Sequence, residues 1–333
     1  MFDHIYYLIF VLTLITTSLL VPQVKKFSIK NNFFDDPNKR KQHKNPKPRL
    51  GGLAVFISFI ISCGISSFLL KGSGNSTNLI NIFMIFGSCF FLLGFIDDLK
   101  SLSPFFRLFM EFLFAIFIFK SGLRINSFIN PFVFNNSNIL FLPNTLNNVF
   151  SILWIVGVTN AINWIDGLDG LLVSVVSIFN FSLLIRFTET NNIEGILLSL
   201  ILLSTCLGFL RFNKFPSSIF LGDGGSYFLG FVLSALTLIS FTNNSQETFN
   251  SLGLNSFDVL GASLFLLVPL ADMCRVIFIR LRNKKSPFYS DRNHLHHLLL
   301  ERGLTVNQTV ISILCLIMIT TFIVFLRDYL VFS

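Results

Sequence analysis

The chain has 333 residues, of which 53% are hydrophobic and only 13% are charged, and its mean hydropathy is +0.71. A soluble domain usually carries about 25% charged residues, so this composition excludes an ordinary soluble enzyme, a disordered protein and a fibrous repeat. The net charge of +8 would suggest nucleic acid on a soluble protein, but on a membrane protein it first reports orientation, so we expect no nucleic-acid partner.

Ten apolar segments follow one another along the chain, and a helix of roughly 20 residues crosses a bilayer. They cover residues 5–22, 51–70, 79–96, 105–121, 145–163, 170–187, 193–211, 226–242, 257–279 and 307–327. The first has no basic region before it and no small-residue cleavage site after it, so it is a retained span. Pro269 predicts a kink in the ninth. The five Cys form no CxxC pair, which gives a disulfide framework or a zinc site little support.

The predicted fold class is therefore an all-α polytopic membrane protein of about ten transmembrane helices. Residues 1–333 form one domain, and the chain left between the spans is too short for a soluble domain of the usual ~100 residues. Any active-site cleft must be built from loops and helix ends. The stretch 124–144, rich in Asn and Pro, predicts a short outer hairpin.

The loops divide sharply by charge. One alternating set, with its immediate flanks, holds 20 of the 25 Lys and Arg, and the opposite set holds 5. The positive-inside rule places the basic set in the cytoplasm and both termini outside. The basic set consists of residues 23–50, 97–104, 160–170, 211–225 and 280–306.

The first basic loop, 23–50, carries nine Lys and Arg and ends in Arg49-Leu50, followed by two glycines. Such a loop fixes topology and attracts anionic lipid headgroups. It also suits recruitment of a phosphate-bearing lipid, and both interpretations can hold together.

Asp97 and Asp98 follow the third apolar segment. Two adjacent carboxylates repel each other unless a proton or a cation lies between them, which suits Mg²⁺ binding or proton abstraction. A solvated helix cap, with Lys100 offsetting the charge, is the alternative.

The stretch NAINWIDGLDG at 160–170 is the most informative. Asn163, Asp166 and Asp169 recur every three residues, so neighbouring members share a helix face. Gly167 and Gly170 let the backbone approach a ligand closely. So many polar side chains beside an apolar span are costly without a partner. The alternative is a turn, which needs neither two carboxylates nor two amides.

The stretch LGDGGS at 221–226 opens the eighth segment, and glycines before a helix make a concavity suited to anions. Asp223 has the wrong sign for a phosphate unless it holds the metal that bridges to that phosphate. The alternative is a capped helix start, with Asp223 or Ser226 at the N-cap.

The stretch DRNHLHH at 291–297 ends a basic loop that begins near Arg280. On a helix, His294 and His297 share a face and His296 points elsewhere. Imidazole and guanidinium groups near acidic motifs suit the binding of a diphosphate. A basic helix on the membrane surface is the alternative, and zinc has poor support because no further ligands accompany the histidines.

Six stretches, in order, resemble the polyprenyl-phosphate N-acetylhexosamine-1-phosphate transferases, which form glycosyltransferase family 4. They are PRLGGLAVF at 48–56, FIDDLKS at 95–101, NAINWIDGLDGL at 160–171, FLGDGGSYFLGF at 220–231, PLADMCRVIFIRL at 269–281 and SPFYSDRNHLHHLL at 286–299. The His-x-His-His form resembles the undecaprenyl-phosphate N-acetylglucosamine-1-phosphate transferase branch more than the muramoyl-pentapeptide branch, whose pattern runs three His together.

The resemblance implies a reaction in which a lipid phosphate attacks the β-phosphate of a UDP-N-acetylhexosamine and UMP leaves. Undecaprenyl phosphate is the expected acceptor and N-acetylglucosamine the expected sugar. The product would be the first lipid-linked intermediate of a cell-surface polysaccharide, made at the bacterial inner membrane. The resemblance also implies Mg²⁺ as cofactor, with Mn²⁺ as its substitute, and it is compatible with a homodimer.

The resemblance assigns roles residue by residue. Asn163 and Asp223 are the expected metal ligands, and Asp97 and Asp98 match the acidic pair that deprotonates or orients the lipid phosphate or assists the metal. The residues expected to bind substrate are Asp166, Asp169, Arg280, His294, His296 and His297, with Asp169 nearest the uridine.

Two other classes stay open on the residues alone. A secondary transporter would place ionisable residues near mid-span and often shows inverted repeats, whereas here the acids cluster at span ends and no repeat is seen. An intramembrane prenyltransferase would carry two separated Asp-rich motifs without the His cluster. Release of UMP from a UDP-sugar in the presence of polyprenyl phosphate separates the three.

Overall fold

A computed structural model describes residues 2–35, 46–72, 76–129, 139–140, 143–243, 256–289 and 291–332. Regular structure in these ranges is almost entirely helical, which confirms the all-α membrane fold. The helices are α1 (Phe2–Lys30), α2 (Gly51–Gly72), α3 (Asn78–Lys100), α4 (Pro104–Lys120), α5 (Asn144–Ile165), α6 (Leu171–Glu189), α7 (Ile193–Asn213), α8 (Gly222–Ser240), α9 (Val259–Phe265), α10 (Leu267–Arg282), α11 (Leu295–Glu301) and α12 (Val306–Phe332).

All ten predicted apolar segments are helical over most of their length. In the described part of the chain, eight helices are long and apolar enough to cross a membrane, and the α9–α10 pair makes nine if it counts as one span. The remaining predicted span is α4, whose 17 residues lie at the short end of the range for a membrane helix.

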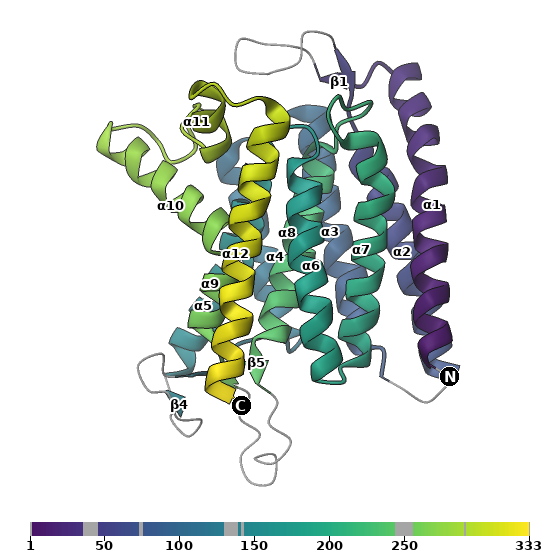
Figure 1. The fold of residues 1–333 in the computed structure, drawn as a ribbon, viewed down its shortest axis with the longest axis vertical. Coiled ribbons are helices and arrows are strands. Elements are labelled where there is room, and N and C mark those ends of the chain that lie inside the picture. Colours follow the sequence, from purple (N-terminus) through teal and green to yellow (C-terminus); the bar gives the residue numbers. More distant parts are fainter. Residues whose placement is uncertain are drawn as a thin grey trace.

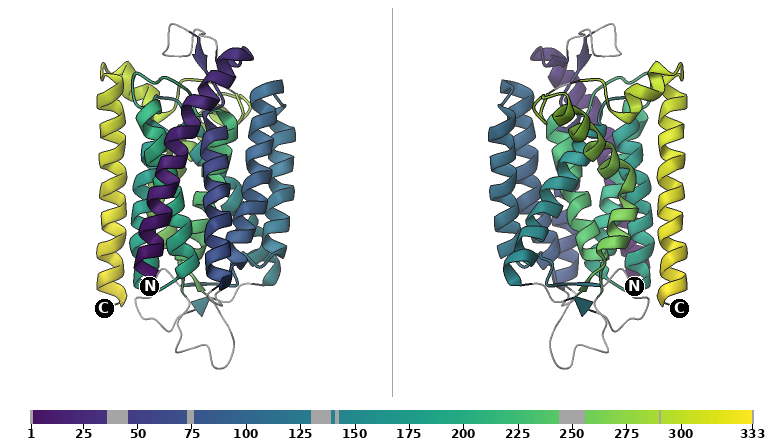
Figure 2. Two further views of the ribbon diagram at one scale, coloured as in Figure 1. Left: turned by 90° about the vertical axis from the view of Figure 1, so that its right-hand side faces the viewer. Right: turned by 90° about the vertical axis from the view of Figure 1, so that its left-hand side faces the viewer.

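The helices run side by side, and both termini lie at the same end of the bundle (Figures 1 and 2). We call this the terminal end. The opposite end carries α11 and the strand β1 (Phe34–Asp35), and we call it the motif end. The alternation of loops that the charge count predicts is therefore present, with both chain termini on one face.

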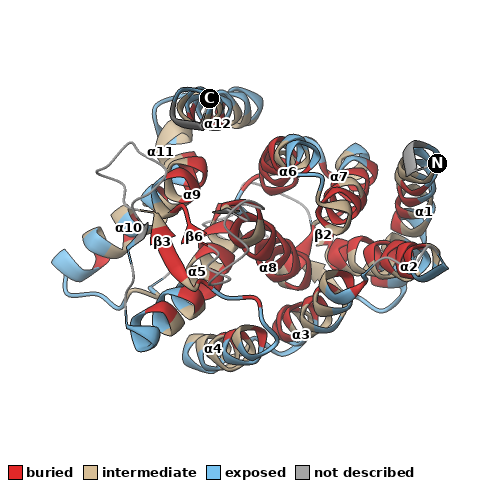
Figure 3. Cartoon of the chain, turned by 90° about the horizontal axis from the view of Figure 1, so that it is seen from below, coloured by how far each residue is buried: buried red, intermediate tan, exposed pale blue. Residues whose placement is uncertain are grey.

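Helix α8 lies at the centre of the bundle, with α2, α3, α5, α6 and α7 around it (Figure 3). Its Phe residues interlock with those of neighbouring helices. The rings of Phe228 and Phe59 pack edge to face with their centroids 5.1 Å apart, and the rings of Phe231 and Phe90 stack with their centroids 4.9 Å apart. Rings packed in this way bury large apolar areas and lock helices in register, so the start of α8 is held rigidly at the motif end.

The ninth predicted span, 257–279, is not one kinked helix. The helix is interrupted at Leu266, and the axes of α9 and α10 differ in direction by 82°. Pro269 lies in the first turn of α10 instead of a helix interior, where its missing N–H leaves no hydrogen bond unmade. The kink predicted at Pro269 is therefore misplaced, because the bend lies at Leu266. After the bend, α10 runs out from the side of the bundle to the motif end (Figure 1).

Two small sheets close the ends. At the motif end, β1 pairs with β2 (Lys47–Pro48). A four-stranded sheet orders β4 (Ile139–Leu140), β3 (Ser127–Ile129), β6 (Ser256–Phe257) and β5 (Thr242–Asn243). The antiparallel pairing of β3 with β4 confirms the hairpin predicted within 124–144, although residues 130–138 and 141–142 lie outside the described residues.

Candidate active site

The loop before α2 docks on the loop before α8. The Gly51 and Gly52 amides donate to the carbonyl oxygens of Phe220 and Leu221 at 2.8 and 2.7 Å, and the Phe220 amide donates to Pro48 at 2.9 Å. The two predicted glycine motifs are thus one unit, although about 170 residues separate them in the sequence. This docking holds Arg49 over the first turn of α8.

Arg49 bridges two acidic motifs. Its Nη2 lies 2.7 Å from Asp98 Oδ1 and 2.7 Å from Asp223 Oδ2. Burial disfavours the guanidinium charge, but the carboxylates of Asp98, Asp223 and Asp35 outweigh this effect and raise the pKa of Arg49. A permanent cation therefore lies between the predicted catalytic pair and the predicted metal ligand.

Asp98 caps α8 from another helix. Its Oδ1 accepts from the Asp223 amide at 2.8 Å and its Oδ2 accepts from the Gly224 amide at 2.9 Å, and its side chain is 1% exposed. Gly222 has φ +80, and a Cβ there would lie 2.7 Å from Asp98 Oδ2. The carboxylate thus meets the positive end of the α8 dipole. Neither Asp223 nor Ser226 is the N-cap of α8, so the capped-start alternative is wrong.

Asp97 faces the turn between α3 and α4. Its Oδ1 accepts from the Leu102 amide at 2.6 Å, and its Oδ2 is ion-paired with Arg107. Asp97 is 5% exposed. The predicted catalytic pair is therefore buried and partnered on both sides, with each carboxylate holding one arginine. Its catalytic role stays a prediction.

Asp223 and Asn163 come together from α8 and α5. The Asn163 amide hydrogen-bonds with the Asp223 carboxylate, and its Nδ2 donates to Ser226 Oγ at 2.6 Å. The Asp223 side chain is 32% exposed, so it is open to a ligand, unlike Asp98.

This donor set fits a magnesium ion. Carboxylate and amide oxygens are the ligands that Mg²⁺ prefers, and the ion usually keeps several waters and takes only one or two protein carboxylates plus substrate phosphates. Among the described residues, no three His, Cys, Asp or Glu side chains are grouped to hold a metal by themselves. A cation here would therefore depend on Asp223, Asn163 and the substrate.

Asp166 follows α5 and lies close enough to Asp223 and Asp98 for their negative charges to repel its own. Desolvation and repulsion from these carboxylates raise the pKa of Asp166 to about 7, and Arg49 opposes them. Because Asp166 is exposed to solvent, we attribute the raised pKa mainly to repulsion between the carboxylates and less to desolvation. The site thus carries more negative than positive charge, as expected of a place that takes up a cation.

Asp169 lies at the side of the site with a basic partner. Its Oδ2 is 3.0 Å from Lys47 Nζ and accepts from the Ser217 amide at 2.9 Å. Lys47 also lies over the Phe220 ring, 4.9 Å from its centroid. The α5–α6 loop, the first basic loop and the α7–α8 loop therefore meet at one point.

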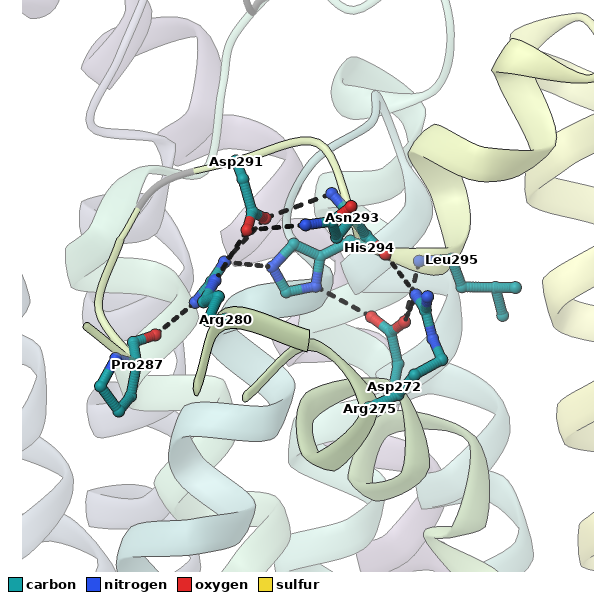
Figure 4. Close-up of polar contacts among 8 residues, drawn as sticks. All are labelled: Asp272, Arg275, Arg280, Pro287, Asp291, Asn293, His294 and Leu295. Carbon is teal, nitrogen blue, oxygen red and sulfur yellow. Dashed lines mark hydrogen bonds and ion pairs between the residues drawn. The ribbon is translucent and has the colours of Figure 1, made fainter. Parts of the chain in front are cut away.

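The loop after α10 forms its own polar cluster (Figure 4). Arg280 donates two hydrogen bonds to Asp291, from Nε to Oδ2 at 3.0 Å and from Nη2 to Oδ1 at 3.1 Å. Burial alone would raise the pKa of Asp291, but these hydrogen bonds and those from Asn293 lower it to about 2. His294 Nδ1 lies 2.9 Å from Asp272 Oδ2, while its Nε2 lies 3.4 Å from Arg280 Nη2. Arg280 and His294 are thus fixed before any ligand arrives.

His296 joins this cluster to the rest of the site. A Cβ on Gly167 would lie 2.1 Å from His296 Nε2, so the ring packs directly on the glycine of the α5–α6 loop. Burial and the neighbouring imidazoles of His297 and His294 lower the pKa of His296 to about 3, and His297 is lowered for similar reasons. Trp164 packs against the same cluster: the centroid of its ring lies 5.6 Å from that of His294 and 5.0 Å from Arg280 Cζ.

The structure therefore brings the predicted residues into one region of the motif end. Four supporting residues were not among the predicted site residues: Lys47, Arg49, Arg107 and Asp272. Arg107 and Asp272 carried a usable signal, because each is a charged residue inside an apolar segment at the motif end. Arg49 belongs to the stretch PRLGGLAVF but was given no site role, and Lys47 is one of nine basic residues in its loop.

Comparison with known proteins gives a consistent family. The model of glycosyl transferase family 4 matches residues 80–241. The "Probable undecaprenyl-phosphate N-acetylglucosaminyl 1-phosphate transferase" of Bacillus subtilis is 30% identical over 304 residues, which cover 91% of this chain and 80% of that protein. The undecaprenyl-phosphate alpha-N-acetylglucosaminyl 1-phosphate transferase of Thermotoga maritima is 30% identical over 283 residues, 85% and 78% of the two chains. The phospho-N-acetylmuramoyl-pentapeptide-transferase of Clostridium beijerinckii is 27% identical over 329 residues, 92% of each.

Proposed function

The chain belongs to glycosyl transferase family 4, and from this premise we propose that it transfers N-acetylhexosamine 1-phosphate from a UDP-sugar to undecaprenyl phosphate. N-acetylglucosamine is the first choice of sugar, because the relatives named above include transferases of N-acetylglucosamine 1-phosphate. The product would be the first lipid-linked intermediate of a cell-surface polysaccharide.

One observation carries the proposal. Arg49 joins the carboxylates of Asp98 and Asp223 at 2.7 Å each, and Asn163 lies against Asp223. This arrangement places the fixed positive charge of Arg49 beside carboxylate and amide oxygens that could bind a divalent cation. Transfer of a phosphoryl group needs positioning and charge neutralisation more than covalent help from the protein.

The reaction itself is a displacement at phosphorus. An oxygen of the lipid phosphate forms a bond to the β-phosphorus of the UDP-sugar, the bond from that phosphorus to the bridging oxygen breaks, and UMP leaves with that oxygen. A divalent cation held by Asp223 and Asn163 would neutralise the phosphate charge.

The chain's own residues bind and orient the substrates. Arg49 contacts both Asp98 and Asp223 and keeps part of its side chain exposed, and we assign it, with Arg280 and His294, to the donor diphosphate. Asp97 and Asp98 are each bonded to an arginine. We therefore assign them to orientation instead of proton abstraction. Asp166 and Asp169 lie in the adjoining α5–α6 loop, and their proposed place is the nucleotide side.

We also propose the orientation of the protein in the membrane. The motif end would face the cytoplasm of a bacterium and both termini would face outside, because the basic loops gather at that end. A UDP-sugar made in the cytoplasm would then reach the site from water, and the lipid phosphate would reach it from the bilayer surface.

The deciding experiment uses the purified full chain in detergent with undecaprenyl phosphate and a series of UDP-N-acetylhexosamines. The expected result is UMP release that requires both substrates and yields a lipid-linked sugar diphosphate. Absence of UMP release with every donor would contradict the proposal. Release of UMP without the lipid would instead indicate a hydrolase.

A further inference from the structure

A buried polar layer lies beneath the candidate active site, inside the bundle. Glu111 of α4 is 1% exposed, and the Asn160 amide of α5 donates to its Oε2. Tyr227 of α8, which is 3% exposed, interacts with the same carboxylate. One side chain therefore connects three helices that belong to different parts of the sequence.

Each member of this layer stands one helical turn from a residue of the site. Asn160 precedes Asn163 by three positions, Tyr227 follows Asp223 by four, and Glu111 follows Arg107 by four. Residues three or four apart on a helix share a face. Glu111 thus ties together the helices that carry both proposed cation ligands and the arginine that holds Asp97.

Packing alone does not explain the layer. An acidic side chain deep in a membrane helix is costly and marks function by default, and the buried neighbours of Glu111 on α4, Ala115 and Ile118, are apolar. Its Oε1 has no hydrogen-bond partner among the described residues. A carboxylate kept here at such cost is better explained by the site above it than by the contact between helices.

We propose that Glu111 is a positioning residue of the transferase. Through Asn160 and Tyr227 it fixes the separation of Asn163 and Asp223, and so the geometry in which a divalent cation and the donor diphosphate are bound. This inference rests on the proposed function for the identity of the donor, but the positioning of cation ligands is testable without turnover.

The test compares Glu111→Leu and Glu111→Gln with the wild type. A matched control is Glu194→Leu, because Glu194 also joins two helices, accepting from the Ile80 amide at 3.1 Å, but lies at the terminal end. Two measurements are made on each protein: Mn²⁺ binding followed by electron paramagnetic resonance, and kcat and KM for UDP-N-acetylglucosamine. Thermal unfolding of each variant is recorded beside them.

Loss of a group that orients a metal ligand typically weakens metal affinity or activity about 10- to 100-fold, and this is the expected loss for Glu111→Leu. Glu111→Gln keeps an acceptor oxygen for Asn160 and is expected to stay close to wild type. Glu194→Leu is expected to leave Mn²⁺ affinity unchanged even if it lowers the unfolding temperature. If Glu111→Leu does not fold, Asn160→Ala removes the other partner of the same hydrogen bond and takes its place.

The proposal is overturned if the Leu variant binds Mn²⁺ like the wild type, or if its losses only match those of Glu194→Leu. A wild-type chain that binds no Mn²⁺ also overturns it. A chain that binds Mn²⁺ but releases no UMP contradicts the proposed function alone, and the binding series then decides the role of Glu111.

Discussion

Asp98 and Asp223 share one arginine but have different surroundings. Asp98 is closed off by two amides of α8 and by Arg49, whereas about a third of the Asp223 side chain is open to solvent. A carboxylate with every oxygen partnered fixes geometry, while an open one can take a ligand. The two residues therefore call for different tests.

We predict that Asp223→Asn abolishes UMP release while the protein still folds and inserts. Asparagine keeps the size and one acceptor oxygen but removes the charge that a cation and Arg49 require. Turnover and gel-filtration profile measure the two effects separately. Asp328→Asn is the control, because Asp328 is also ion-paired, with Arg186, but at the terminal end. Near-normal turnover of Asp223→Asn would show that Asp223 is not the metal ligand and that another carboxylate has this role.

A second prediction concerns the cation itself. Excess EDTA should stop UMP release, and added Mg²⁺ should restore it, because both substrates are anionic and Arg49 is already shared between two carboxylates. EDTA saturated with Mg²⁺ beforehand is the control for other effects of the chelator. Undiminished release in excess EDTA would show that the site works without a divalent cation.

Asp98 gives a prediction about stability. Asp98→Ala removes the acceptors for two amides at the start of α8, and loss of an N-cap costs about 0.5–2 kcal/mol. Asp98→Asn should cost less than Asp98→Ala, because it keeps one of the two acceptor oxygens. Thermal unfolding in detergent compares the three proteins. Equal stability of the Ala variant and the wild type would show that the two amides find other acceptors.

At the scale of elements, the site depends on contacts between a loop and a short helix. The α5–α6 loop meets α11 where His296 packs on Gly167. His296 is 3% exposed, its ring stacks on that of His294, and the ring of His297 lies tilted against it, so both neighbours hold it in place. The break between α9 and α10 matters for the same reason, because it directs α10 outward and lets its loop return over the site.

We predict that Gly167→Ala lowers turnover about 10- to 100-fold, as expected when catalytic groups are misplaced by about 1 Å. The new methyl group would overlap His296 and displace the histidine cluster. Gly157→Ala is the matched control, since Gly157 lies on the adjoining helix α5 and a Cβ there meets nothing within 4 Å. If both variants keep full turnover, the histidine cluster does not contribute to the reaction.

At the scale of the whole molecule, the charge of the loops and the direction of the helices agree. The basic loops gather at the motif end, and both termini lie at the terminal end. An ion-paired group at the terminal end, Arg327 with Asp258 and Arg186 with Asp328, fastens α12 to α6 and α9. Charges at the terminal end thus join helices, while those at the motif end belong to the candidate active site.

The corresponding prediction is one of topology. Alkaline phosphatase fused after Ser333 should be active, because it needs the oxidising compartment outside the inner membrane. A fluorescent protein fused after Asn283, at the end of α10, should be fluorescent in the cytoplasm. An inactive phosphatase fusion together with a non-fluorescent Asn283 fusion would reverse the proposed orientation. An inactive phosphatase fusion together with a fluorescent Asn283 fusion would remove one span from the count.

The sequence by itself determined the fold class and the end of the molecule at which the candidate site lies. Hydropathy acts on each segment separately, so the apolar runs located the membrane helices, except that the ninth run proved to hold two helices, α9 and α10. Basic loops set orientation one by one, and the acidic, glycine and histidine motifs all fell in the same set of loops. The residues expected to bind the metal and substrate could therefore be named without coordinates.

Only the tertiary structure decided which of these side chains are buried against partners and which are exposed to solvent. Asp98 caps a helix that begins 124 positions later, Lys47 pairs with Asp169, and Glu111 reaches Asn160. Such partners come from segments far apart in the chain, so no local pattern records them. The 82° break before α10 is also set by packing, since Pro269 alone would fit either a kinked helix or a helix start.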